Sequence, residues 1–274
     1  MKLFDNIFSR KPRGVTYKHP SCVYVPHVKM LPGIDVSNVN KGYVSASFKS
    51  KKRLKFQVEC NDIVYNYDLP MDGKVTIFPI NLGNGSYTFR IMQNIHDNEY
   101  IEIESSSIDI SLIDEFSPYL IPNQLCQYNE NSLCVKKAYE LTSKATNEAE
   151  VVSIICTYIA KNISYDDIKC EKYIHLKNYI PDPDKTYVSR SGICFDYASL
   201  AAAMLRSLRI PTKIVTGYVG QDKKYHAWIK VYVDGVWKTT KFAIYPNVWS
   251  SLDVTFAATG KRIHDNMYIE KYIY

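Results

Sequence analysis

The sequence of 274 residues lacks any apolar stretch approaching the ~18 residues that a membrane-spanning helix requires. The first 14 residues also lack the apolar core and the small-residue cleavage site of a secretory signal. Glycine and proline are sparse, at 11 and 12 residues, which excludes a low-complexity chain. We therefore expect a soluble, cytoplasmic globular protein without a membrane span. Its N-terminus is expected to fray, with a short helix at a membrane surface as the alternative.

Cysteine spacing excludes two common kinds of site. The seven cysteines form an odd set without any C-x-x-C pair, so neither a zinc site nor a thioredoxin-type motif is expected. The set fits reduced thiols in a cytosol, most of them buried as small apolar side chains. The cysteines stand at positions 22, 60, 126, 134, 156, 170 and 194.

Positive charge is in modest excess and is spread along the chain. Lysine and arginine number 34 and aspartate and glutamate 28, which gives a formal net charge of +6. The densest basic patch, residues 49–53, is expected to form a hairpin turn rather than part of a basic stripe. We therefore predict no nucleic-acid partner.

Residues 42–112 are rich in β-branched and aromatic side chains and are interrupted by Asn, Asp and Gly turns. Leu54, Phe56 and Val58 alternate with polar residues, a period that places one strand face in a core and the other in water. Six such strands at short spacing predict a small β-sandwich. The expected strands are 43–49, 53–60, 63–69, 74–80, 86–95 and 99–112.

The pattern changes after residue 118. Residues 132–143 and 147–162 show helical spacing, and Asn147 with Glu150 resembles a capping box. Residues 165–190 are predicted to form a long loop, a feature often used as a lid or a binding loop. We expect an α+β chain of three parts. These are an N-terminal extension over 1–34, an immunoglobulin-like β-sandwich over 35–115 and a second domain over 116–274.

One predicted helix places a cysteine in a distinctive position. Residues 194–208 carry an apolar stripe about four turns long, and Pro211 prevents the helix from continuing. Gly192 supplies a turn before it, so Cys194 falls in the first helical turn. The positive helix end and its unpaired N–H groups favour a thiolate there and can receive an oxyanion. A buried, inert thiol is the alternative.

Two strands, 212–218 and 225–233, are expected after this helix, joined by a polar turn. In the second strand, aliphatic residues alternate with His226 and Trp228, which places His226 off the aliphatic face. A helix that packs across these strands can bring Cys194 to His226.

Five short motifs follow one another along the chain: Asn162-Ile163-Ser164-Tyr165-Asp166, Arg190-x-Gly192-x-Cys194-x-Asp196-x-Ala198, Met204-Leu205-Arg206-Ser207-x-x-Ile210-Pro211, Gly217-Tyr218 and His226-Ala227-Trp228. Together they resemble the bacterial transglutaminase-like superfamily of papain-like Cys-His-Asp proteins, over roughly residues 118–262. The resemblance implies a core in which the nucleophile helix packs on an antiparallel sheet. The N-terminal sandwich matches only an architecture in which such a domain precedes the catalytic one.

The resemblance also implies roles for individual residues. Cys194 is expected to be the nucleophile and His226 the base that activates it. The oxyanion hole is expected to use the Cys194 backbone N–H and an upstream amide, for which Gln124 and Gln127 are the candidates. A polar loop without a catalytic role is the alternative for the two glutamines.

The third member of the triad is less direct to assign. The family usually places an aspartate four residues after a Trp that follows a glycine turn, and after Trp237 that position holds Lys241. Lysine cannot accept a hydrogen bond from an imidazole. A second copy of the pattern follows Trp249, so we interpret 238–248 as an insertion and assign Asp253. A solvated turn acid is the alternative.

The predicted function is cysteine-dependent acyl transfer through a thioester, on a protein or peptide substrate and with no metal or organic cofactor implied. Hydrolysis by a cysteine protease or amidase is favoured over transglutaminase cross-linking, by resemblance alone. Tyr225 and Trp228 are candidates to wall the substrate cleft, or else pack the sheet.

Two other functions compete with the enzymatic one. The alternative from another class is a non-catalytic peptide- or glycan-binding module, against which the intact Cys, His and Asp argue. Acetyl transfer is disfavoured because no Gly-rich phosphate loop or basic cluster lies near the motifs.

Overall fold

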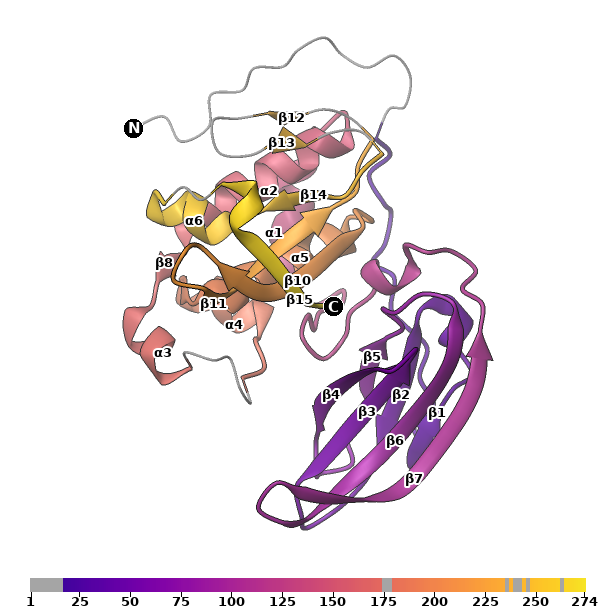
Figure 1. Cartoon of the computed structure of the whole chain (residues 1–274). Coiled ribbons are helices and arrows are strands. Elements are labelled where there is room, and N and C mark those ends of the chain that lie inside the picture. The colour runs from indigo at the N-terminus through magenta and orange to yellow at the C-terminus, as the bar shows by residue number, and fades with distance from the viewer. Residues whose placement is uncertain (1–16, 174–178, 235–236, 239–242, 245–246, 262–263) are drawn as a thin grey trace. The chain divides into compact units, whose positions relative to one another are not determined.

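The computed structural model describes residues 17–173, 179–234, 237–238, 243–244, 247–261 and 264–274, so the prediction for the first residues lies outside it. The chain divides into two compact units (Figure 1). One is Pro26–Tyr119, and the other combines Leu120–Tyr274 with the segment that ends at Val25. The boundaries expected after residues 34 and 115 remain predictions.

The first unit contains two antiparallel sheets and two short 3-10 helices, η1 (Val39–Lys41) and η2 (Ser117–Tyr119). The three-stranded sheet has the order β1 (Gly33–Asp35), β2 (Tyr43–Ser47) and β5 (Thr76–Pro79). The four-stranded sheet has the order β4 (Ile63–Leu69), β3 (Leu54–Cys60), β6 (Gly85–His96) and β7 (Glu99–Ile110). All six predicted strands are present, and β1 is an addition.

The alternation along β3 explains how the two sheets pack. Its residues are alternately buried and half-buried, as the sequence predicts. Phe56 of β3 stacks on Phe78 of β5 with ring centroids 4.4 Å apart, so an aromatic core joins the sheets. Burial of each such ring stabilises the fold by about 2–3 kcal/mol. This is the predicted sandwich arrangement, while the immunoglobulin-like label remains a prediction.

The second unit is built on a four-stranded antiparallel sheet. Its order is β14 (Ser250–Leu252), β11 (Lys224–Val231), β10 (Thr212–Val219) and β15 (Tyr268–Ile273). Two short pairs accompany it: β8 (Ser164–Tyr165) with β9 (Ser191–Gly192), and β12 (Trp237–Lys238) with β13 (Ala243–Ile244). The helices are α1 (Leu133–Thr142), α2 (Glu148–Asn162), α3 (Asp167–Lys172), α4 (Pro183–Ser189), α5 (Cys194–Ser207) and α6 (Val254–Thr259), with η3 (Asp265–Met267).

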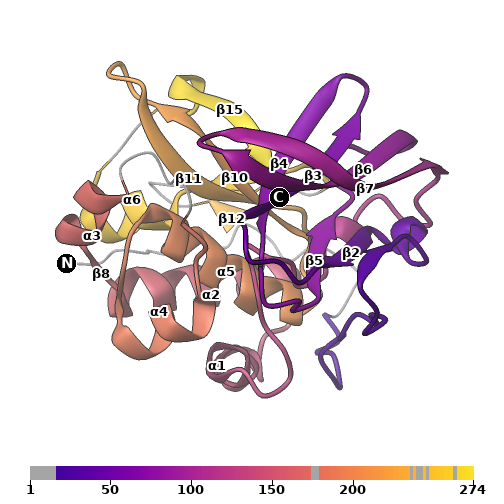
Figure 2. The ribbon, with the colours of Figure 1, turned by 90° about the horizontal axis from the view of Figure 1, so that it is seen from below.

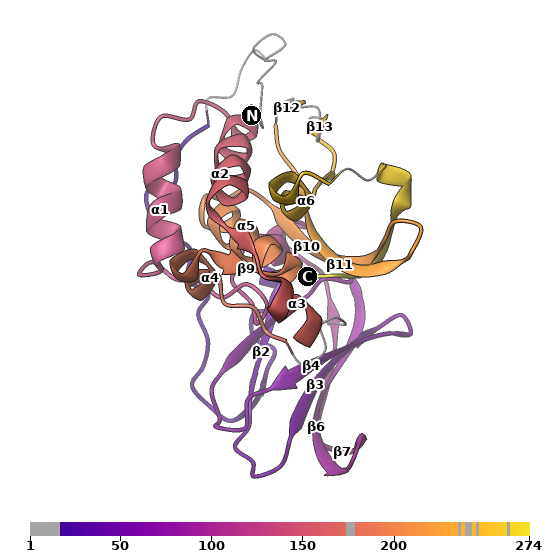
Figure 3. The same cartoon turned by 90° about the vertical axis from the view of Figure 1, so that its left-hand side faces the viewer.

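Helix α5 is the centre of this unit. Helices α1, α2 and α5 gather on one side of the sheet, and α5 contacts β10 and β11 directly (Figures 2 and 3). All of its residues are buried, and the run Ala201, Ala202 and Ala203 lets neighbouring elements approach closely. The predicted helices and the two predicted strands are confirmed. The fold is α+β, with Cys194 as the first residue of the central helix.

The predicted loop over 165–190 is wrong, because it contains α3 and α4. Asp166 caps α3 by accepting a hydrogen bond from the Lys169 N–H. Asp182 caps α4 in the same way through the Lys185 N–H, and Pro183 occupies the first helical turn. Helices of 6 and 7 residues are too short to show an apolar stripe, so only these caps marked them.

Within the described ranges, no helix combines the length and the apolar composition needed to cross a membrane. All seven cysteines lie in the described part of the chain and carry free thiols. Five of them are buried, as predicted, while Cys22 is exposed and Cys170 is partly exposed.

Candidate active site

The backbone before α5 delivers Cys194 to the first position of the helix. Strand β9 pairs with β8, and Ile193 then serves as the N-cap residue. The Asp196 carboxylate accepts a hydrogen bond from the Ile193 N–H at 2.8 Å. A side chain at Gly192 would place its Cβ 2.6 Å from the Asp196 Cβ, so only glycine fits this turn. The backbone N–H groups of the first turn, which lack partners within the helix, therefore lie at the end of α5 where Cys194 stands.

His226 and Asp253 come from adjacent strands of the sheet. His226 lies in β11, opposite Gly217 of β10. Asp253 directly follows β14 and caps α6, where its Oδ1 accepts the Phe256 N–H at 2.9 Å. The His226 Nε2 and the Asp253 Oδ2 lie 2.7 Å apart, and both side chains are buried. A carboxylate at this distance fixes the orientation of the imidazole.

Cys194 interacts with the same imidazole closely enough to raise its pKa. Because Asp253 occupies Nε2, the atom left for the Cys194 sulfur is Nδ1. Burial lowers the pKa of His226, but Asp253 and Cys194 outweigh it and raise this pKa from 6.5 to about 10. His226 is therefore an imidazolium at neutral pH, a proton donor held between two acidic groups.

Aromatic rings enclose the imidazole. Phe256 stacks on His226 with ring centroids 4.4 Å apart and an interplanar angle of 11°. The Tyr268 hydroxyl donates to Asp253 Oδ2 at 3.0 Å, so His226 and Tyr268 share one carboxylate oxygen. Neither Phe256 nor Tyr268 was identified from the sequence. A signal existed for Phe256, which stands three residues after the capping Asp253, but none marked Tyr268.

Two phenols lie within electrostatic range of Cys194. Burial, the hydrogen bond to Cys170 and the charge on Cys194 all raise the pKa of Tyr165. Burial dominates the raised pKa of Tyr225, to which Cys194 also contributes, although its bond to Thr216 opposes the shift. The Tyr225 hydroxyl donates to Thr216 Oγ1 at 2.9 Å, which restrains the orientation of the ring.

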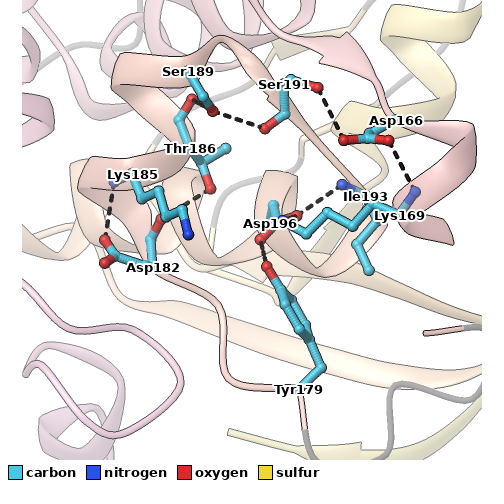
Figure 4. Close-up of polar contacts among 10 residues, drawn as sticks. All are labelled: Asp166, Lys169, Tyr179, Asp182, Lys185, Thr186, Ser189, Ser191, Ile193 and Asp196. Atoms are coloured by element: carbon cyan, nitrogen blue, oxygen red, sulfur yellow. Dashed lines mark hydrogen bonds and ion pairs between the residues drawn. The ribbon is translucent and has the colours of Figure 1, made fainter. Parts of the chain in front are cut away.

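Asp196 has three partners: the N-cap residue Ile193, Lys169 and Tyr179 (Figure 4). The carboxylate is completely buried, and its Oδ2 lies 2.7 Å from the Lys169 ammonium. Its Oδ1 accepts a hydrogen bond from the Tyr179 hydroxyl, and its Oδ2 also accepts the Ile193 N–H. The cation and the two hydrogen-bond donors supply the partners that a buried carboxylate needs.

The other predicted residues lie at different depths. Gln124 is buried, whereas Gln127 is exposed and its amide donates to the Gln124 carbonyl at 3.4 Å. This segment packs on α5, because Ser199 Oγ donates to the Leu125 carbonyl at 2.7 Å. Trp228 is only 1% exposed and packs in the core, which does not fit a wall of a substrate cleft.

Lys241 and most of the inferred insertion over 238–248 lie outside the described residues. Elsewhere in the described ranges, His, Cys, Asp and Glu side chains form no group of three suited to holding a metal ion.

Residues 135–241 match the family described as the transglutaminase-like superfamily. The match includes Cys194 and His226 and ends before Asp253. Over 161 residues the chain is 28% identical to the UPF0252 protein MJ1282 of Methanocaldococcus jannaschii, covering 55% of this chain and 45% of that protein. It thus spans less than half the length of this curated relative.

Two solved structures share parts of the architecture at low similarity. One is a protein of Cytophaga hutchinsonii provisionally assigned as a cysteine protease, with a TM-score of 0.43 and 16% identity, covering 85% of this chain and 76% of that one. The other is red sea bream transglutaminase, with a TM-score of 0.31 and 13% identity, covering 78% of this chain and 48% of that one.

Proposed function

We propose that this protein, whose residues 135–241 match the transglutaminase-like superfamily, catalyses cysteine-dependent acyl transfer. The observation that carries the proposal is the hydrogen bond between His226 and Asp253, together with the interaction of Cys194 with the same imidazole. A thiol, an imidazole and an orienting carboxylate in this order are the parts that nucleophilic catalysis needs.

In the proposed first half-reaction, the Cys194 thiolate attacks the carbonyl carbon of a peptide or amide bond. A sulfur–carbon bond forms and the carbonyl electrons move onto oxygen. When this oxyanion collapses, the carbon–nitrogen bond breaks and the leaving amine takes a proton from the His226 imidazolium. The products are a thioester on Cys194, a free amine and a neutral His226.

In the second half-reaction, His226 removes a proton from the incoming acceptor, which attacks the thioester. Water as the acceptor yields a carboxylic acid, and a primary amine yields a new amide. Either route returns the sulfur to its starting form and the proton to His226. We favour hydrolysis of a peptide or protein substrate, and cross-linking is the competing outcome. Asp253 keeps the imidazole in one orientation through both halves.

The oxyanion is proposed to bind the Cys194 backbone N–H at the start of α5. We favour Gln124 over Gln127 as the second donor, because Gln124 is buried on the segment that packs against α5. Tyr225 is proposed to contact the substrate, since its ring is partly exposed and within electrostatic range of Cys194.

The test uses p-nitrophenyl acetate as an acyl donor that demands no particular recognition. We expect a burst of p-nitrophenol equal to the enzyme concentration and an acetyl group on the peptide that contains Cys194. The burst should vanish in Cys194→Ala and slow by at least about 100-fold in His226→Ala, the usual contribution of a general base. Acetylation that falls equally on exposed Cys22 would contradict the proposal.

The products formed from the same thioester show whether water or an amine is the acceptor. Added ethylenediamine competes with water for the acetyl group, and mass spectrometry counts acetate against the N-acetyl product. A product ratio that follows the amine concentration supports transfer. Acetate alone, at every amine concentration, supports a hydrolase.

A further inference from the structure

We infer that Lys169 is a positioning residue for the nucleophile: its ammonium group neutralises the buried Asp196 carboxylate and so preserves the electrostatic field at Cys194. This inference rests on the proposed function and adds a residue that no motif of the sequence marks. Lys169 stands 25 positions before Cys194, in helix α3.

The ion pair between Lys169 and Asp196 is held in place by the groups around it. The Lys169 Nζ lies 2.7 Å from Asp196 Oδ2, and the Asp196 side chain is completely excluded from solvent. The same ammonium lies 4.8 Å from the centroid of the Tyr179 ring, whose hydroxyl donates to the other Asp196 oxygen. Burial first, and then Asp196 itself, raise the pKa of Tyr179, so this phenol stays a neutral donor. Lys169 is therefore the cation that balances Asp196.

Helix α3 is tied to the backbone that precedes Cys194. The Asp166 N–H donates to the Gly192 carbonyl at 3.0 Å, and the Ser191 hydroxyl donates to Asp166 Oδ2 (Figure 4). The Asp166 Oδ1 caps α3 through the Lys169 N–H. These bonds fix the position of the Lys169 backbone relative to the turn at 191–193. The Lys169 side chain therefore starts from a defined position beside this turn.

The balance matters because Cys194 and Asp196 share the first turn of α5. A helix N-terminus favours negative charge through its N–H groups, and an unneutralised carboxylate there would oppose a second negative charge on the sulfur. With Lys169 in place, the Asp196–Lys169 pair is close to neutral. The positive end of α5 then acts on Cys194 without competition.

The test compares the rate at which iodoacetamide alkylates Cys194, followed by peptide mass, in the unaltered full-length protein and four variants. At about pH 6 an ordinary thiol of pKa ~8.5 is almost fully protonated, so the rate reports the activated sulfur. We expect Lys169→Met to slow alkylation by about tenfold, the effect of one unit charge in a partly screened site. Lys169→Arg should restore the rate, because the positive charge returns.

Two further variants separate this role from a structural one. In Lys169→Met combined with Asp196→Asn, both charges are absent, and we expect most of the lost rate to return. Lys55→Met is the matched control, because Lys55 is equally exposed and makes a comparable ion pair with Asp68, at 2.6 Å, in the other unit. It should leave the Cys194 rate unchanged.

The outcomes are distinguishable from failure of the proposed function. If Cys194 of the unaltered protein reacts no faster than exposed Cys22, the proposed function fails and the role of Lys169 with it. If Cys194 is fast there and equally fast in Lys169→Met, only the role of Lys169 is overturned. A double variant as slow as Lys169→Met would also overturn it, since the effect would not pass through the charge of Asp196.

Discussion

The two units of the protein differ in what they bury. Among the described residues, the buried Asp, Arg and His side chains all belong to the second unit; they are Asp196, Arg206, His226 and Asp253. In the sandwich the core is aromatic and aliphatic, and the ion pairs Lys55–Asp68 and Arg90–Glu59 lie at its surface.

The two kinds of core serve different ends: apolar burial stabilises the sandwich, whereas buried charges in the second unit fix the positions of side chains. A sandwich core gains its free energy from non-directional burial, which tolerates substitution by residues of similar volume. Buried charges gain little net stability and demand fixed partners. The second unit carries this cost at Cys194 and its neighbours, where fixed orientation is what the proposed chemistry requires.

The largest expected effect is on Arg206, which is 1% exposed. Its guanidinium donates to the carbonyls of Thr212, Ile121 and Tyr274. We expect Arg206→Met to lower the free energy of unfolding by about 3–5 kcal/mol, since these carbonyls lose their donor. The three tryptophans at 228, 237 and 249 all lie in the second unit, so urea unfolding followed by tryptophan fluorescence reports on that unit.

The matched variant in the sandwich is Arg90→Met. Arg90 pairs with Glu59 and Glu102 at the surface, with a quarter of its side chain exposed. Its loss should cost less than about 1 kcal/mol, measured by circular dichroism. Equal losses for the two arginines would break the contrast between the units.

The next effect is a dependence of stability on pH that is confined to the second unit. The pKa of His226 is raised in the fold from 6.5 to about 10. Its stabilising interaction is therefore complete below pH 6.5 and disappears as pH rises through about 10. We expect the tryptophan-detected free energy of unfolding to fall across this interval.

The control for this pH effect is Asp253→Asn, which removes the charge that Asp253 contributes to the raised pKa of His226. The decline between the two pH values should flatten in this variant. A slope identical to that of the unaltered protein would mean that another group carries the pH dependence.

The smallest expected change in stability is that of Tyr268→Phe. It removes one hydrogen bond to Asp253, which costs about 1 kcal/mol. Tyr139→Phe is the matched control variant. The Tyr139 hydroxyl also makes one hydrogen bond, to the Ser207 carbonyl at 3.1 Å, but near the far end of α5. Both should lose similar stability, but only Tyr268→Phe should slow alkylation of Cys194. If both variants slow it, or neither does, Tyr268 has no special link to the site.

Helices and strands were predictable where the segment is long enough for its apolar residues to show a clear helical or strand period. Alternation at Leu54, Phe56 and Val58 identified β3, and the long apolar stripe after Cys194 identified α5. The short α3 and α4 were missed because no stripe develops in 6 or 7 residues. The dipeptide Asp182-Pro183, a cap followed by proline, was the available signal.

The site was predictable only in part, because its contacts depend on tertiary packing. Motif spacing selected Asp253, and the structure joins it to His226 by a hydrogen bond. Trp228 was expected at a cleft because strand alternation cannot tell that Phe256 and Tyr268 cover its face. Tyr268, which donates to Asp253, lies in β15, and this strand meets β10 with an irregular register at Gly217, where a Cβ would lie 2.0 Å from the Ile269 carbonyl oxygen.

The most direct test of the central claim is the alkylation rate of Cys194 by iodoacetamide at about pH 6, where free thiols of pKa ~8.5 react slowly. Exposed Cys22 serves as the reference thiol in the same molecule. The account predicts that Cys194, although buried, reacts faster than Cys22 and loses this advantage in His226→Ala. Equal rates for the two thiols in the unaltered protein, or an advantage that survives in His226→Ala, would contradict it.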